Sequence, residues 1–270
     1  MVLLILAITL ALLITIVLPV AAGFWLNRRL GVPIRVVTYG ALGYFLVQAL
    51  VTLAFSGVNA LAEGSTFTLS GESLNTAQIL LSVFLGALFG VLIRWLGMRY
   101  LRENMDNLEA AYGIGVGYGG AESIMIVGLP LLTTFITMLS NMNIDPQNSA
   151  LEPAVIEQIE TLWQVPAYIP LIGSLERIAA LVMHITVTIL ILQVFIGKSK
   201  LWLLAAFGLE MVVNGLIVGL AEVGLQYGWV ILISLVLMVG NLYLLYRLRA
   251  FEFDITRGMQ KEGDASPDHT

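Results

Sequence analysis

Long apolar runs separated by short polar stretches dominate the pattern of the chain. A helix needs about 20 consecutive apolar residues to cross the hydrocarbon core of a bilayer, and we find about seven such runs. The fourth run is too long for a simple crossing, so we expect it to tilt, kink or extend beyond the lipid. The pattern therefore predicts an all-α, polytopic integral membrane protein. Its predicted spans are 3–26, 34–56, 78–97, 110–139, 174–196, 201–220 and 226–246.

The polar stretches are too short to hold a soluble domain, so residues 1–250 are predicted to form a single transmembrane domain. The first run has no positively charged start and exceeds the apolar core of a signal peptide, so we expect it to be a retained span. In 151–163 the apolar residues recur on one helical face, which predicts an interfacial helix on the outer leaflet. That helix either covers a loop or guides substrate. Residues 251–270 are predicted to form a disordered cytoplasmic tail.

The basic residues alternate from one connection to the next. Of the 13 Lys and Arg residues, all except Arg177 fall at one set of span ends or in the C-terminal tail. The alternate connections at 57–77, 140–173 and 221–225 contain none. Cytoplasmic loops are enriched in Lys and Arg, so we predict an outside N-terminus and a cytoplasmic C-terminus in the cell membrane. The basic residues on that side are Arg28, Arg29, Arg35, Arg94, Arg99, Arg102, Lys198, Lys200, Arg247, Arg249, Arg257 and Lys261.

Composition narrows the chemistry. The chain of 270 residues is 59% hydrophobic and 11% charged, far from the balance of a soluble domain. It has no cysteine, which excludes disulfides and thiolate chemistry. Of its two histidines, His269 lies in the polar tail, so histidine chemistry in the membrane must use His184. A net charge of −5 argues against nucleic acid as a partner, and the apolar composition makes the lipid bilayer the expected surroundings of the chain.

Three ionisable residues lie deep inside predicted spans: Glu122 in the fourth, His184 in the fifth and Glu210 in the sixth. At about 1.5 Å per residue they lie roughly 18, 15 and 14 Å deep in a core about 30 Å thick. Each costs about 2.5–3.5 kcal/mol to insert, so each needs a partner or a cavity. We expect the three to converge near the midplane, either as a functional site or as hydrogen-bonded glue between helices.

Each deep residue has polar neighbours on its own helical face. Tyr118 precedes Glu122 by four residues, and Asn214 follows Glu210 by four. Glu176 and Arg177 lie about two turns before His184 and either support the site or form an ion pair at the interface. Five glycines lie just before Glu122 and favour either close helix packing or a local break. They are Gly113, Gly115, Gly117, Gly119 and Gly120.

Elimination leaves few plans for peptide cleavage in a membrane. The H-E-x-x-H zinc motif needs two histidines on one helix, and the spans contain only His184. An aspartyl protease needs two aspartates within the spans, and every aspartate of this chain lies outside them. A serine–histidine pair through Ser123 lacks a nucleophile turn. What remains is a water activated by Glu122 and assisted by His184. A zinc ion held by Glu122, His184 and Glu210 would also supply the three ligands of an open catalytic site.

Two sequence motifs resemble those of the YhfC-like intramembrane endopeptidases. Residues 117–122, G-Y-G-G-A-E, resemble the G-H-G-G-x-E motif of that family. Residues 176–184, E-R-I-A-A-L-V-M-H, resemble its E-R-x-x-A-x-x-x-H. Glu210 and Asn214 fall where the family carries H-x-x-x-N or H-x-x-x-D. The resemblance extends over most of the chain in span number and motif order.

The resemblance implies a mechanism like that of the glutamic CAAX-processing, bacteriocin-processing and PrsW-type membrane proteases, with a glutamate-activated water and no required cofactor. It implies that Glu122 and His184 are catalytic, and that Asn214 orients the water or binds the oxyanion. Glu176 and Arg177 would support them. Two positions depart from the family pattern.

The departures are Tyr118 and Glu210, which stand where the family has histidines. Tyrosine can donate a hydrogen bond but is a poor base near neutral pH. A glutamate reverses the charge of a protonated histidine. Two alternatives to a divergent peptidase therefore remain. One is an inactive relative that binds membrane peptides or acts as a scaffold, and the other is a proton-coupled transporter that uses the deep residues as a relay.

Overall fold

The computed structural model describes residues 1–63, 71–100, 107–142, 152–197, 199–222, 224, 226–248 and 250. The predicted tail 251–270, with His269, lies outside this part of the chain. The described residues are helical without strands, and seven helical segments are long and apolar enough to cross a membrane. The predicted all-α, multi-pass membrane fold is thereby confirmed. The side of the membrane on which each end lies stays a prediction.

Five of the seven spans are single helices from one end to the other, and the other two, the first and the fourth, contain a π-helical segment. The first span is α1 (Val2–Leu12), η1 (Leu13–Val17) and α2 (Leu18–Leu30), and the second is α3 (Ile34–Glu63). The third is α4 (Gly71–Tyr100), and the fourth is α5 (Leu108–Ser123), η3 (Ile124–Gly128) and α6 (Leu129–Ser140). After α7 (Pro153–Gln164) come α8 (Tyr168–Ile196), α9 (Leu201–Glu222) and α10 (Tyr227–Arg247).

The expected irregularity in the fourth span is a π-helical segment. η3 begins two residues after Glu122 and leads to Pro130 at the start of α6. Proline lacks the N–H that an α-helix would use, so a wider turn before it accommodates the lost hydrogen bond. The first span has the same design, with η1 followed by Pro19. The two π segments lie in contact, and Ser123 Oγ donates a 3.0 Å hydrogen bond to the Thr15 carbonyl there.

The core of the bundle is built on α5 and α8. α5 packs against α3 on one side and α8 on another, and α8 also contacts α9 and α10. The glycines of α5 make this approach possible. A Cβ on Gly117 would collide with the Val37 carbonyl of α3, and one on Gly115 would lie 2.7 Å from the Ile185 Cα of α8. Close packing is therefore their role, and the helix is continuous through all five of them.

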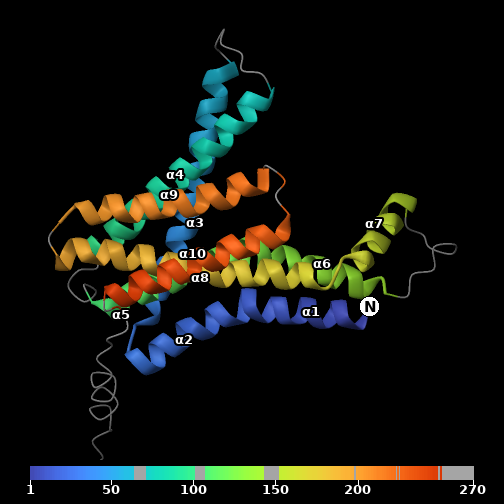
Figure 1. Ribbon diagram of the computed structural model, residues 1–270, viewed down its shortest axis with the longest axis horizontal. Helices are drawn as coiled ribbons and strands as arrows, with labels where there is room; N and C mark the ends of the chain where they lie inside the picture. Colours follow the sequence, from blue (N-terminus) through green and yellow to red (C-terminus); the bar gives the residue numbers. More distant parts are fainter. Residues whose placement is uncertain are drawn as a thin grey trace, which may run out of the picture.

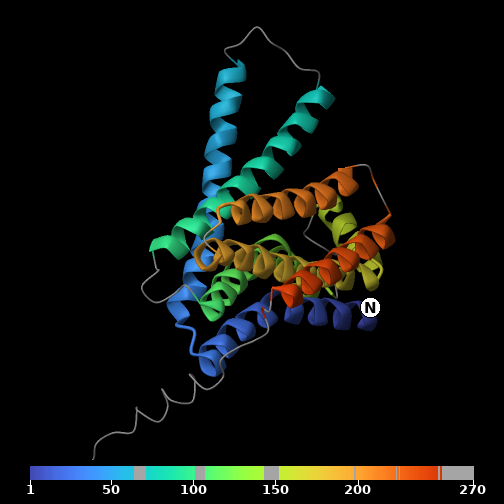
Figure 2. The ribbon, with the colours of Figure 1, turned by 60° about the vertical axis from the view of Figure 1, so that its left-hand side comes forward.

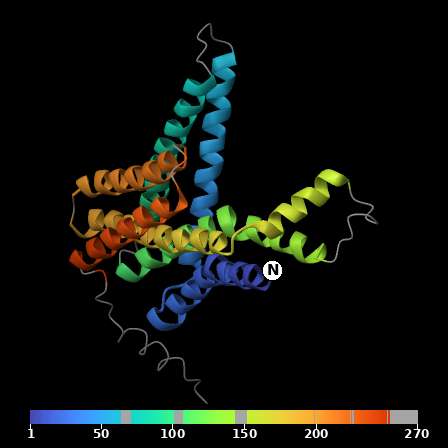
Figure 3. The same cartoon turned by 45° about the vertical axis from the view of Figure 1, so that its right-hand side comes forward.

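The remaining helices project from or cover this core. The far ends of α3 and α4 rise together beyond the other helices (Figures 1 and 2). At another edge, α6 and α7 extend outward near the N-terminus (Figure 3). α7 is the helix predicted at 151–163, and its Ile159 is buried. Its position at the outer surface of the membrane stays a prediction. Leu162 and Trp163 pack against a cluster of Leu4, Ile8 and Met138. This face of α7 thus covers the ends of α1 and α6.

Candidate active site

The central contact of the site joins Glu122 on α5 to His184 on α8. Glu122 Oε2 lies 2.8 Å from His184 Nε2, and the two form an ion pair when the imidazole is protonated. The approach is off the line of a ring N–H hydrogen bond, and both ring nitrogens are buried without a hydrogen-bond partner among the described residues. Gly119 makes room for the imidazole, because a Cβ there would lie 3.1 Å from His184 Cδ2. The glycine run thus allows the glutamate and histidine to meet.

Arg177 binds the other oxygen of the same carboxylate. Its Nη1 donates a 3.0 Å hydrogen bond to Glu122 Oε1, and its Nη2 donates a 2.7 Å hydrogen bond to Glu176 Oε1. The guanidinium therefore bridges two carboxylates, one on its own helix and one on α5. The structure brings Glu122, Glu176, Arg177 and His184 into one network. Arg177 stays inside the protein because two acidic partners compensate its charge.

Glu210 is held by a different partner, which the sequence did not reveal. Both oxygens of Glu210 accept hydrogen bonds from Arg94 Nη2, at 2.6 and 2.5 Å. Arg94 Nε also donates a 2.8 Å hydrogen bond to the Gly90 carbonyl of its own helix, α4. Both side chains are almost completely buried. Arg94 is thus a charge inside the bundle rather than one of the cytoplasmic charges that indicate orientation.

The ring of Tyr118 lies between the Arg94–Glu210 pair and the Glu122–His184 pair. The Arg94 guanidinium lies 4.4 Å from the centre of the Tyr118 ring, a cation–π contact. The same ring is 5.0 Å from the His184 ring and meets Tyr44 edge to face at 5.5 Å. Tyr118 therefore separates the Arg94–Glu210 pair from the Glu122–His184 pair. The three deep residues expected to converge form two neighbouring groups, with an aromatic ring between them.

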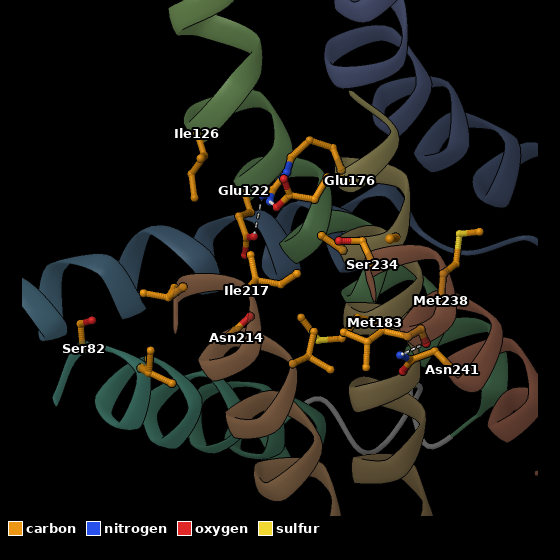
Figure 4. Close-up of a pocket in the computed structure, with 18 of the residues that line it drawn as sticks. Ser82, Glu122, Ile126, Glu176, Met183, Asn214, Ile217, Ser234, Met238 and Asn241 are labelled. Atoms are coloured by element: carbon orange, nitrogen blue, oxygen red, sulfur yellow. Dashed lines mark hydrogen bonds and ion pairs between the residues drawn. The ribbon is translucent and has the colours of Figure 1, made fainter. Parts of the chain in front are cut away.

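A cavity of about 420 Å³ borders the Glu122 network and is drawn in Figure 4. Its lining comes from α3, α4, α5, η3, α8, α9 and α10 and is mostly apolar. The Glu122 side chain is 18% exposed and reaches this space, whereas the His184 side chain is 1% exposed and does not line it. His184 thus contacts the carboxylate from inside the protein, whereas Glu122 itself borders the cavity.

Of two other candidate residues from the sequence, one lines the cavity and the other does not. Asn214 lines the cavity, and Figure 4 shows its side chain on the α9 wall near Ile217. Ser123, the conceivable nucleophile, is not among the lining residues, and its hydroxyl is bonded to Thr15. A carboxylate and an amide therefore face the same space, and the serine does not.

The residues do not fit the zinc site that the sequence allowed. An open catalytic zinc site needs three protein ligands. Glu122 and His184 would supply two of them, but both oxygens of Glu210 are taken by Arg94. Arg177 also places a fixed positive charge beside Glu122. Among the residues that the structure describes, no group of three His, Cys, Asp or Glu side chains is placed to hold a metal ion.

Comparisons with known proteins agree with this architecture. The chain is 24% identical over 206 residues to a protein of Bacillus subtilis (strain 168) named "Uncharacterized membrane protein YhfC", covering 74% of this chain and 79% of that protein. No solved structure matches the chain. The model of the family described as YhfC intramembrane metalloprotease matches residues 14–239. The chain therefore belongs to the YhfC intramembrane metalloprotease family.

Proposed function

We propose that this protein hydrolyses a peptide bond of a membrane-embedded substrate with a water activated by Glu122. The observation that carries the proposal is the position of the Glu122 carboxylate, held by His184 and Arg177 and open to a cavity of about 420 Å³. Family membership supports a peptidase as the class of protein. The cavity supplies space for both the water and a segment of peptide.

The proposed reaction depends on the hydrogen-bond acceptor sites of the Glu122 carboxylate that its protein partners leave open. An ionised carboxylate has about four lone-pair sites, and the contacts to Arg177 and His184 leave sites for a water in the cavity. Glu122 takes a proton from that water while the water oxygen forms a bond to the carbonyl carbon of the substrate. Glu122 then passes the proton to the departing amine nitrogen as the C–N bond breaks.

The surrounding residues have distinct parts in this proposal. Asn214 faces the cavity and can donate its amide N–H to the developing oxyanion. His184 and Arg177 orient the carboxylate, and Glu176 holds Arg177 in place. Tyr118 separates His184 from Arg94 and keeps the Glu210 pair out of the reaction.

The family description includes a metal, and the donor set in this chain does not fit one. The position that the resemblance assigns to a further histidine is Glu210, and a buried arginine neutralises it. We therefore propose that hydrolysis in this protein depends on fixed side-chain charges. A peptide-binding relative without activity is the second candidate, favoured by the ion pairing of both deep carboxylates.

His184 provides the test that separates these candidates. In the chain reconstituted in liposomes with a transmembrane reporter peptide, His184→Gln is expected to lower kcat by about 10²-fold, the scale of misplacing a catalytic group. KM is expected to stay unchanged because His184 does not line the cavity. The measurement is the initial rate of product formation against reporter concentration.

Thr186→Val is the matched control for this variant. Thr186 is a buried residue of the same helix, and its hydroxyl donates a 2.8 Å hydrogen bond to the Val182 carbonyl of that helix. It is expected to keep the wild-type kcat. A His184→Gln variant that cleaves at the wild-type rate would contradict the proposed role, and a wild-type chain that binds the reporter without cleaving it would favour the peptide-binding candidate.

A further inference from the structure

A second set of polar groups lines the same cavity on α10. Ser234 and Asn241 are seven residues apart, about two helical turns, and so lie on one face of that helix. Both line the cavity, and Figure 4 labels both among its lining residues. Each residue is 4% exposed. Neither belongs to the Glu122 network.

Both residues carry a polar atom without a partner. Ser234 Oγ and Asn241 Oδ1 are buried and have no hydrogen-bond partner among the described residues. Asn241 Nδ2 donates a 2.8 Å hydrogen bond to the Leu237 carbonyl. Exchanging the oxygen and nitrogen of this amide would still leave one of its ends unpaired. Burial of two such atoms in apolar surroundings costs free energy unless a further molecule forms hydrogen bonds with them.

The rest of this part of the cavity is apolar. Met183, Leu237 and Met238 line it beside Ser234 and Asn241. Apolar walls with a few spaced polar atoms match a peptide segment with apolar side chains and unpaired backbone amides. A peptide that stays helical has already used its N–H groups internally, so it would leave these acceptors unfilled. A lipid acyl chain has no donor to offer.

We infer that Ser234 and Asn241 form a subsite that accepts backbone N–H groups from an unwound segment of a membrane peptide. This inference rests on the proposed function and names its substrate class: a transmembrane peptide whose helix opens inside the cavity. The acceptors on α10 compensate the backbone groups that unwinding leaves unpaired. Glu122 and Asn214, which line the same space, then meet an accessible peptide bond.

The test measures binding with two peptides that differ only in their backbone donors. One is a fluorescent, Leu-rich transmembrane peptide with a central Gly-Ala-Gly, and the other carries N-methyl groups on those three residues. Affinities are measured by anisotropy with the full chain in phosphatidylcholine nanodiscs. Wild type is expected to bind the unmethylated peptide about tenfold more tightly. In Asn241→Leu, and separately in Ser234→Ala, the ratio is expected to fall well below tenfold, because each variant keeps only one of the two acceptors.

Asn141→Leu is the matched control, because Asn141 makes the same 2.8 Å bond to the carbonyl four residues earlier but does not line the cavity. It is expected to keep the tenfold ratio. Thermal unfolding in the same discs is expected to show both cavity variants at least as stable as wild type, since each loses an unpaired polar group. The two variants are independent, so either one is sufficient for the comparison.

Three results would overturn the inference. They are a wild-type chain that binds both peptides equally, a ratio that survives in both cavity variants, and loss of a co-purified phospholipid from the variants without any peptide discrimination. The readout is binding, so it is separate from cleavage. Discrimination without cleavage supports the subsite and contradicts the proposed hydrolysis, whereas cleavage without discrimination overturns the subsite alone.

Discussion

Glu122→Gln is expected to lower kcat for a transmembrane reporter by about 10²–10⁴-fold, the contribution of a positioned general base. Glutamine has the same shape and keeps an oxygen that can accept the Arg177 hydrogen bond, but it cannot take a proton from water. The fold is expected to survive, because Arg177 also keeps its bond to Glu176. Cleavage rates and unfolding temperatures of the purified variant in proteoliposomes check both parts.

Glu109→Gln is the control for this substitution. Glu109 lies in the first turn of α5, the helix that carries Glu122, and does not line the cavity. The same chemical change there is expected to leave kcat unaltered. Equal cleavage by wild type and Glu122→Gln would remove the carboxylate from the mechanism, and an unfolded Glu122→Gln chain would make its role structural.

Breaking the Arg94–Glu210 pair is expected to produce the largest loss of stability. Arg94→Met leaves the Glu210 carboxylate buried without its partner, and removal of one member of a buried ion pair costs about 3–5 kcal/mol. Glu210→Leu leaves the Arg94 guanidinium buried without its partner and is expected to lower the free energy of unfolding by a similar amount. The measurement is the free energy of unfolding of each variant in detergent micelles.

The double variant Arg94→Met/Glu210→Leu supplies the decisive comparison. Replacing a whole buried pair with apolar residues is often neutral or stabilising, so the double variant is expected to recover most of the loss seen in either single variant. A loss equal to the sum of the two single losses would show that the residues act independently. That result would contradict the pairing seen at 2.5 and 2.6 Å.

The membrane fold was predictable because long apolar runs leave few alternatives. The spans agree closely in the middle and differ at their ends. α8 begins at Tyr168 rather than near 174, and Pro170 falls in its first turn. The first N–H groups of a helix have no partner within it, so proline is tolerated there. Apolar content marks the lipid boundary, whereas a helix continues for as long as its own hydrogen bonds do.

The sequence was sufficient to name the residues of the candidate site, but not to show the direction in which each side chain points. The level of Glu122, His184 and Glu210 follows from counting residues along each span, and Glu122 does meet His184. Counting does not show which way each side chain points around its helix. Glu210 points to Arg94, which lies inside the predicted span 78–97 and was counted as a flanking charge. A basic residue inside an apolar run was the available signal for this pair.

The polar groups of α10 left almost no signal in the sequence. Ser234 and Asn241 are uncharged, and single serines and asparagines are common in spans because they can bond to their own helix. Their unpaired atoms emerge only when α8, α9 and α10 enclose the cavity. Individual polar residues of this type acquire meaning from three-dimensional neighbours, which one sequence does not supply.

The most direct test of metal-independent hydrolysis by Glu122 is cleavage by metal-free protein. The chain is purified with a strong chelator, its zinc content is measured by elemental mass spectrometry, and reporter cleavage is followed in metal-free liposomes with wild type and Glu122→Gln side by side. We expect wild type to cleave at its full rate with far less than one zinc per chain, and Glu122→Gln to remain inactive. Loss of wild-type cleavage on chelation, restored by one equivalent of zinc, would contradict the account.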